Sequence, residues 1–113
     1  MRLELFSSVR EGDQPNLVCL QNSKLTALPT VLVCPLKESM AMTPLRVRFS
    51  LGGKDWVVAC DLLRPIHRQG LRPMGYLDEK TSVEIVQTFL RILPGPFAEA
   101  GLRPGFRYER RGR

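Results

Sequence analysis

The stretch PLRVRFSLGGKDWVVAC, residues 44–60, contains the strongest secondary-structure signal in the chain. Apolar and polar residues alternate from Leu45 to Leu51, which is the pattern of a half-buried strand. The two glycines that follow tolerate the positive φ that a tight hairpin turn requires. A second apolar run then begins at Trp56. We therefore expect an antiparallel hairpin, with Trp56 in the core or in a subunit interface.

Shorter apolar runs indicate further strands. Residues 2–6 alternate, and the runs LVCLQ (residues 17–21) and TVLVCPL (residues 30–36) contain the β-branched residues that strands favour. The polar run at residues 7–16 is typical of a loop. After glycine and proline breaks, one more short strand is expected around GYL, residues 75–77.

One helix is expected, over residues 82–93. Thr81 and Glu84 have the T-x-x-E spacing of a capping box. An apolar stripe at helical spacing follows, made of Val83, Val86, Phe89, Leu90 and Leu93. The run Pro94-Gly95-Pro96 ends the pattern. Such a stripe must be buried, so we expect this helix to pack on a small sheet.

The length and composition fit one domain. The chain has 113 residues, 43% hydrophobic and 25% charged, enough for a single modest core. No run approaches the roughly 18 consecutive apolar residues of a membrane span, and the charged N-terminus is unlike a signal peptide. We expect a cytoplasmic protein with no membrane partner. It has a folded unit over residues 1–93 and a flexible basic tail over residues 94–113.

The cysteines and the net charge indicate which cofactors and partners to expect. Cys19, Cys34 and Cys60 lie in apolar runs without C-x-x-C spacing, so we expect buried thiols, no metal and no other cofactor. The net charge is +6, and the tail holds five arginines against two glutamates. An excess of positive charge favours polyanionic partners. With aromatic residues between its arginines, the tail is either a single-stranded nucleic-acid contact or a plain extension.

Arg46 and Arg48 lie on the polar face of the first hairpin strand, about 7 Å apart at the usual rise per residue. They are candidates for nucleic-acid binding. The alternative is an ordinary solvated face on an exposed strand.

The order of elements describes a mainly β fold with a C-terminal helix, a small SH3-like β-barrel. PNLVCLQNSKLTALPTVLVCPL, residues 15–36, resembles the N-terminal half of the CcdB toxins. Residues 48–93 resemble the rest of CcdB and equally the MazF toxins (PemK, Kid), with the overall pattern closer to CcdB. The resemblance implies a homodimeric toxin of a type II toxin–antitoxin module for plasmid or genome maintenance. Its cognate antitoxin would bind through an acidic, disordered segment.

The first functional hypothesis is that of the CcdB-like toxins, which poison DNA gyrase without chemistry of their own. There the end of the C-terminal helix, with a Trp-Gly-Ile terminus, engages the gyrase A subunit. The resemblance then implies a partner-binding set of Phe89, Arg91, Ile92 and Leu93. This helix end lacks the tryptophan, and twenty residues follow it.

The second hypothesis is that of the MazF/PemK-like toxins, which cleave single-stranded RNA without metal. In the PemK-like pattern the strand after the hairpin ends in R-C-D; here Asp61 is kept, but Ala59 replaces the arginine. Cleavage through a 2′-hydroxyl needs a base, an acid and a cation for the phosphate. Asp61, Arg64, Glu38 and His67 form the candidate catalytic set. In the same pattern a Thr-Ser pair follows the Pro-x at the end of an earlier strand. Here Lys37 and Glu38 stand at those two positions.

Asp61, Arg64 and His67 follow one another at three-residue steps, which would place them on one face of a helix. Pro65 opposes this, because the residue before a proline is pushed toward extended geometry. An aspartate at a strand end also commonly caps a turn. A third hypothesis therefore remains, a binding protein that keeps the fold without toxicity.

Overall fold

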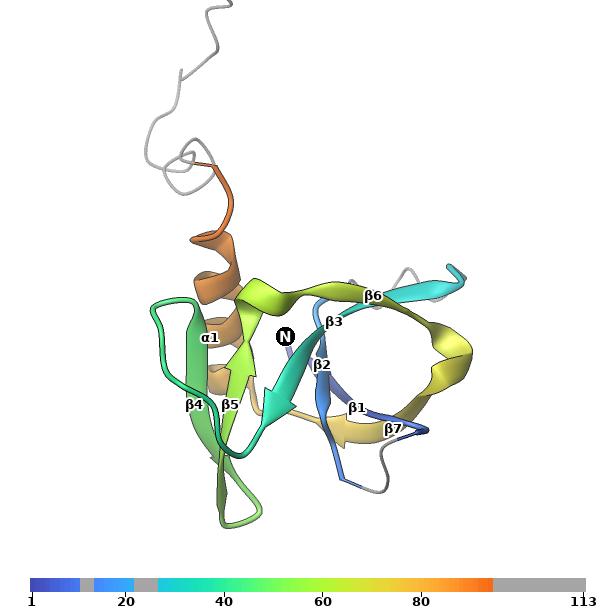
Figure 1. Ribbon diagram of the computed structural model, residues 1–113, viewed down its shortest axis with the longest axis horizontal. Helices are drawn as coiled ribbons and strands as arrows, with labels where there is room; N and C mark the ends of the chain where they lie inside the picture. The colour runs from blue at the N-terminus through green and yellow to red at the C-terminus, as the bar shows by residue number, and fades with distance from the viewer. Residues whose placement is uncertain (11–13, 22–26, 95–113) are drawn as a thin grey trace, which may run out of the picture.

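The computed structural model describes residues 1–10, 14–21 and 27–94, and apart from Pro94 the expected flexible tail lies outside them. This part of the chain forms a mainly β fold with one helix near its C-terminal end (Figure 1). The strands are β1 (Glu4–Ser8), β2 (Leu17–Cys19), β3 (Thr30–Lys37), β4 (Arg46–Leu51), β5 (Lys54–Ala59), β6 (Arg64–His67) and β7 (Leu71–Tyr76). Two 3-10 turns, η2 (Cys60–Leu62) and η3 (Arg68–Gly70), precede β6 and β7, and the helix is α1 (Glu79–Leu90).

The strands pair antiparallel in the order β4-β5-β3-β2-β1-β7, and β6 also pairs with β3. Along one edge of β3, Leu36 pairs with Val58 of β5, and further back Val33 pairs with Arg64 of β6. On the other edge Cys34 pairs with Val18 of β2. Figure 1 shows β3, β2, β1, β7 and β6 curving round into a partly closed barrel, with β4, β5 and α1 to one side. The expected fold class is confirmed.

Side-chain alternation along β3 serves two apolar clusters. Cys34 and Leu36 belong to the larger one, which also contains Trp56 and Ile85. Val33 on the opposite face belongs to the smaller cluster inside the barrel. Because successive strand residues point to opposite faces, one strand connects both cores.

The hairpin of β4 and β5 forms as the sequence predicts. Gly52 and Gly53 have φ of 61° and 81°, the left-handed region that glycine enters without strain. Trp56 is 6% exposed and lies in the core, and its Nε1 donates to the Leu51 carbonyl over 3.2 Å. Separately, all three cysteines are buried thiols outside any disulfide, as expected.

The helix prediction was wrong in its start and end, and right for only part of its buried face. The N-cap is Asp78, whose carboxylate accepts from the Thr81 amide, so the Thr81–Glu84 capping box does not form. The helix ends at Leu90, because the following amides bond three residues back in a tightened turn. Ser82, Ile85 and Thr88 are its buried residues. Of the expected stripe, Val86 and Phe89 pack against the core, whereas Val83 and Leu90 are 36% and 41% exposed, so the packed face is rotated in part.

Two strand bounds also differ from the prediction. β1 extends through Ser7 and Ser8, which the sequence assigned to a loop. β7 starts at Leu71 and contains Pro73 and Gly75, which were expected to break the chain. A bulge in β1 opposite this strand and a positive φ of 106° at Gly75 accommodate them.

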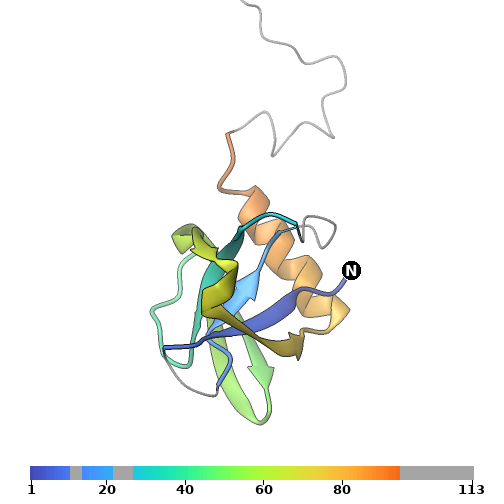
Figure 2. The same cartoon turned by 90° about the vertical axis from the view of Figure 1, so that its right-hand side faces the viewer.

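Helix α1 packs against β4 and η2 (Figures 1 and 2). Within the described residues no helix is long and apolar enough to cross a membrane. The position of α1 matters for function because it supports η2 from behind, where β5 ends and the polar residues of interest begin.

The rotated helix face gives a stability test. Ile85→Ala should lower the free energy of unfolding by about 2–5 kcal/mol, because Ile85 is fully buried. Val83→Ala, on the stripe predicted from sequence, should change it by less than about 0.5 kcal/mol. Urea denaturation of the two variants measures both values. A larger loss for Val83→Ala than for Ile85→Ala would contradict this helix orientation.

Candidate functional site

The candidate site is a pocket beside η2, where the chain passes from β5 to β6. Both strands pair with β3 along the same edge, so the residues between them leave that edge uncovered. The resulting cavity, called here the η2 pocket, has a volume of about 620 Å³. It is lined by Asn16, Leu17, Pro35, Leu36, Lys37, Asp61, Leu62, Leu63 and Arg64. Two of the four predicted catalytic residues, Asp61 and Arg64, are therefore brought together.

Asp61 is held by a two-pronged ion pair with Arg46. Arg46 Nε donates to Asp61 Oδ1 and Arg46 Nη2 donates to Asp61 Oδ2, each over 3.2 Å. Arg46 Nη1 also donates to the Ala41 carbonyl over 2.9 Å. The Arg46 and Asp61 side chains are 16% and 27% exposed. Paired donors and acceptors of this kind fix the orientation of both groups.

Strand register brings Arg46 to Asp61. Arg46 of β4 lies directly opposite Ala59 of β5, and cross-strand partners share a face of the sheet. The small Ala59 leaves room for the longer side chain to reach the residue that begins η2. An arginine near Asp61 is thus present, but it comes from the neighbouring strand.

This pairing lowers the pKa of Asp61. Hydrogen bonds from the Arg46 guanidinium hold the pKa of the Asp61 carboxyl below its ordinary value, and burial opposes this only in part. Asp61 in turn raises the pKa of Arg46. Asp61 is therefore an ionised acceptor at neutral pH, and it cannot serve as a proton donor there.

Two exposed cations complete the pocket. Arg64 stands at the start of β6 with extended backbone, as predicted from Pro65, and Lys37 ends β3. Within residues 1–10, 14–21 and 27–94, neither side chain has a hydrogen-bond or ion-pair partner. Both are thus available to bind an anion in the pocket. Lys37 and Asn16 were not among the site residues predicted from the sequence. Each is only a polar residue at the end of an apolar run, Asn16 before Leu17 and Lys37 after Leu36.

Comparison with known proteins identifies the fold. No protein-family model and no curated protein sequence matches the chain. Among solved structures, a mycobacterial endoribonuclease matches with TM-score 0.66 and 15% identity, over 82% of this chain and 91% of that chain. The Mycobacterium tuberculosis toxin MazF-mt6 matches with TM-score 0.62 and 18% identity, over 80% and 94%. A mycobacterial endoribonuclease in complex with its cognate antitoxin matches with TM-score 0.64 and 14% identity, over 79% and 88%.

This is a MazF-like fold. The expected barrel of the CcdB/MazF type is confirmed, whereas these matches give no support to a closer likeness to CcdB.

The remaining catalytic and nucleic-acid candidates lie outside the η2 pocket of this MazF-like fold. Glu38 forms a 3.5 Å ion pair with Lys54 on the surface. His67 is at the far end of β6, where its Nδ1 accepts from the Gln69 amide at the start of η3. Arg48 is exposed on β4, two residues beyond Arg46. Closeness in sequence therefore does not bring these residues together in one site.

The residues expected to contact gyrase lie around the end of α1. Phe89 is half-buried and packs on the larger core cluster. Arg91 follows the helix end and its Nη1 donates to the Pro44 carbonyl over 3.5 Å. Ile92 is 38% exposed, and Leu93 is half-buried. This end of the MazF-like fold exposes two apolar side chains, Leu90 and Ile92, beside the half-buried Phe89 and Leu93.

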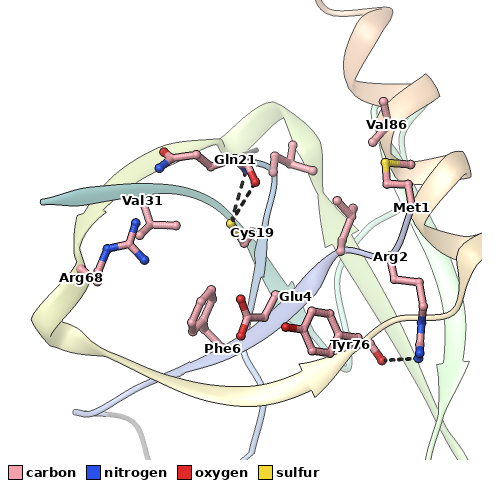
Figure 3. A pocket seen from close by; sticks show the side chains of 12 residues that line it. Met1, Arg2, Glu4, Phe6, Cys19, Gln21, Val31, Arg68, Tyr76 and Val86 are labelled. Atoms are coloured by element: carbon pink, nitrogen blue, oxygen red, sulfur yellow. Dashed lines mark hydrogen bonds between the residues drawn. The ribbon is translucent and has the colours of Figure 1, made fainter. Parts of the chain in front are cut away.

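A second cavity of about 670 Å³ opens at the other end of the barrel (Figure 3). Arg2 lies over the Tyr76 ring at 6.0 Å, and Cys19 Sγ accepts from the Gln21 amide. Burial raises the pKa of the Cys19 thiol, so it is protonated and a poor nucleophile. Within the described part of the chain no three His, Cys, Asp or Glu residues gather as a metal site. The η2 pocket is therefore the better candidate for chemistry.

The ion pair predicts a pH response. Its stabilisation is present above the ordinary carboxyl pKa of about 3.9 and is lost as the pH falls through the lower pKa of folded Asp61. Arg46→Ala should raise the pKa of Asp61, because the donors that favour the carboxylate are gone. NMR titration of the Asp61 carboxyl carbon measures this. Lys80→Ala on α1 removes an equal charge elsewhere and should leave that pKa unchanged; an unshifted pKa in Arg46→Ala would contradict the pairing.

Proposed function

We propose that this chain is the toxin of a toxin–antitoxin module and acts as a metal-independent endoribonuclease on single-stranded RNA. The observation that carries the proposal is the η2 pocket, which ionised Asp61 shares with Lys37 and Arg64, two cations with no partner among the residues that the structure describes. The pocket occurs in a fold matched by mycobacterial endoribonucleases. The fold alone does not determine an activity, so the proposal rests on the pocket.

The pocket supplies groups for cleavage through the 2′-hydroxyl. Lys37 and Arg64 bind the scissile phosphate and stabilise the charge that develops on its oxygens. Asp61 accepts the proton of the 2′-hydroxyl as its oxygen bonds to phosphorus. The bond from phosphorus to the 5′-oxygen breaks, and solvent protonates that oxygen. The products are a 2′,3′-cyclic phosphate and a 5′-hydroxyl.

The low pKa of Asp61 limits what a base can contribute here. A weaker base removes a proton less effectively, so most of the acceleration should come from the two cations. The cavity volume of about 620 Å³ lies in the range of small-ligand pockets and accommodates a nucleotide. Leu62, at 46% exposure on the pocket wall, provides an apolar contact for a base.

The gyrase-poison hypothesis has less support. The end of α1 exposes only Leu90 and Ile92 in part, beside a half-buried Phe89 and Leu93, and Arg91 is bonded back to Pro44. The matched structures are described as MazF toxins and endoribonucleases. The binding-protein hypothesis predicts neither RNA cleavage nor gyrase-dependent DNA breaks.

The partners follow from the same proposal. One matched endoribonuclease was solved with its cognate antitoxin, and the net charge of +6 here favours an antitoxin segment rich in acidic residues. We propose that residues 1–93 form the functional unit, that it acts as a homodimer in the cytoplasm, and that it serves plasmid or genome maintenance. The tail, residues 94–113, is then an addition to that unit.

Cleavage of a long single-stranded RNA in the presence of EDTA tests the activity. The full chain should cut the RNA, and should not cut DNA of the same sequence, because deoxyribose lacks the 2′-hydroxyl. Arg64→Ala should lower kcat/KM about 100-fold, since it removes one donor to the developing charge. Lys80→Ala, a matched loss of charge on α1, should retain full activity.

Two results would contradict the proposal. One is intact RNA after prolonged incubation with folded protein. The other is gyrase-dependent DNA breakage, increased by deleting residues 94–113, which would instead support the gyrase-poison hypothesis. If the protein neither cleaves RNA nor causes DNA breakage, only the binding-protein hypothesis remains.

A further inference from the structure

We propose that Arg46 is the positioning residue of this site, acting through Asp61 rather than on the substrate. It fixes the orientation of the carboxylate and keeps it from pairing with the pocket cations. This inference rests on the proposed ribonuclease function. It assigns a role to a residue that does not line the η2 pocket.

The contacts of Arg46 leave its guanidinium little freedom. A guanidinium has five N–H donors in one plane. Nε and Nη2 donate to the two oxygens of Asp61, and Nη1 donates to the Ala41 carbonyl. Contacts to two separate groups, the Asp61 carboxylate and the Ala41 carbonyl, fix that plane and, through it, the plane of the Asp61 carboxylate. The 16% exposure of the Arg46 side chain is consistent with a support behind the pocket wall.

The contact with Ala41 ties a third segment to the site. Ala41 belongs to the connection between β3 and β4, whereas Arg46 begins β4 and Asp61 lies in η2. Lys37, one of the two pocket cations, ends β3 immediately before that connection. Arg46 therefore links the segment that follows Lys37 to the turn that carries Asp61, and it sets their relative positions.

Arg46 also neutralises the charge of Asp61. Asp61 shares the pocket with Lys37 and Arg64, which have no partner in the described residues. An unrestrained carboxylate there would pair with one of these cations, because opposite charges in contact near a protein surface attract. Such a pair would occupy the donors needed for a phosphate. By bonding both Asp61 oxygens, Arg46 keeps the two cations available for substrate.

A double-mutant cycle on RNA cleavage tests this role. Arg46→Ala, Asp61→Ala, the double variant and the control Lys80→Ala are assayed for kcat and KM in EDTA, each with its melting temperature. Arg46→Ala should lower kcat about 100-fold, because the freed Asp61 carboxylate would occupy a cation that the developing charge on the phosphate needs. The double variant should be no slower than Asp61→Ala alone, because Arg46 acts only through Asp61. Arg46→Lys should recover only part of kcat, since an ammonium cannot make the two-pronged pair.

Chemical rescue separates positioning from simple destabilisation. Guanidinium ion at a non-denaturing concentration should restore part of kcat to Arg46→Ala, with sodium chloride at equal ionic strength as the control. The double variant should not respond, because the carboxylate that would hold the ion is absent. If Arg46→Ala does not fold, Arg46→Lys and its double variant with Asp61→Ala carry the same comparison.

The outcomes are distinct from failure of the ribonuclease proposal. An unmodified chain that does not cleave RNA overturns the proposed function. An active chain in which Arg46→Ala keeps its full kcat overturns the positioning role alone. The role is also overturned if the two single effects multiply in the double variant, which would mean that Arg46 acts independently of Asp61.

Discussion

The constraint on which this structure depends is that β3 pairs with two strands along one edge. Its residues near Leu36 pair with β5, and those near Val33 pair with β6. The chain must leave that edge between them, and it does so as the short turn η2. Polar groups are tolerated there because the turn faces solvent, while the larger core and α1 support it from behind. The pocket is thus a consequence of how β3 is shared.

Local sequence rules predicted the elements whose stability is local. The hairpin around Gly52 and Gly53 and the burial of Trp56 needed only alternation and turn chemistry. The helix shows where such rules fail. Thr81 and Glu84 match a capping box, but Asp78 caps the helix three residues earlier, and packing selects Ile85 rather than Val83 for the core. Propensity and stripe patterns cannot choose between neighbouring faces when both contain apolar residues.

The site was predictable in its residue types but not in its geometry. Asp61 and Arg64 are close in sequence and share the pocket, whereas His67 lies at the far end of the same strand. The partner of Asp61 is fifteen residues away, and only the register of β4 against β5 shows that Arg46 reaches it. Aligned to the R-C-D pattern, Ala59 stands where an arginine is expected, so the sequence alone indicates that the arginine is lost. In three dimensions the guanidinium comes from the neighbouring strand.

The chemical ends of the RNA fragments test the central claim most directly, because they report which oxygen attacks the phosphorus. In the proposed reaction the attacking group is the substrate's own 2′-hydroxyl, held beside Asp61, Lys37 and Arg64. Mass spectrometry of fragments produced by the full chain in EDTA should then find 2′,3′-cyclic phosphates, with 5′-hydroxyls on the following fragments. Fragments that end in 3′-hydroxyls and 5′-phosphates would contradict it, since water would have been the nucleophile.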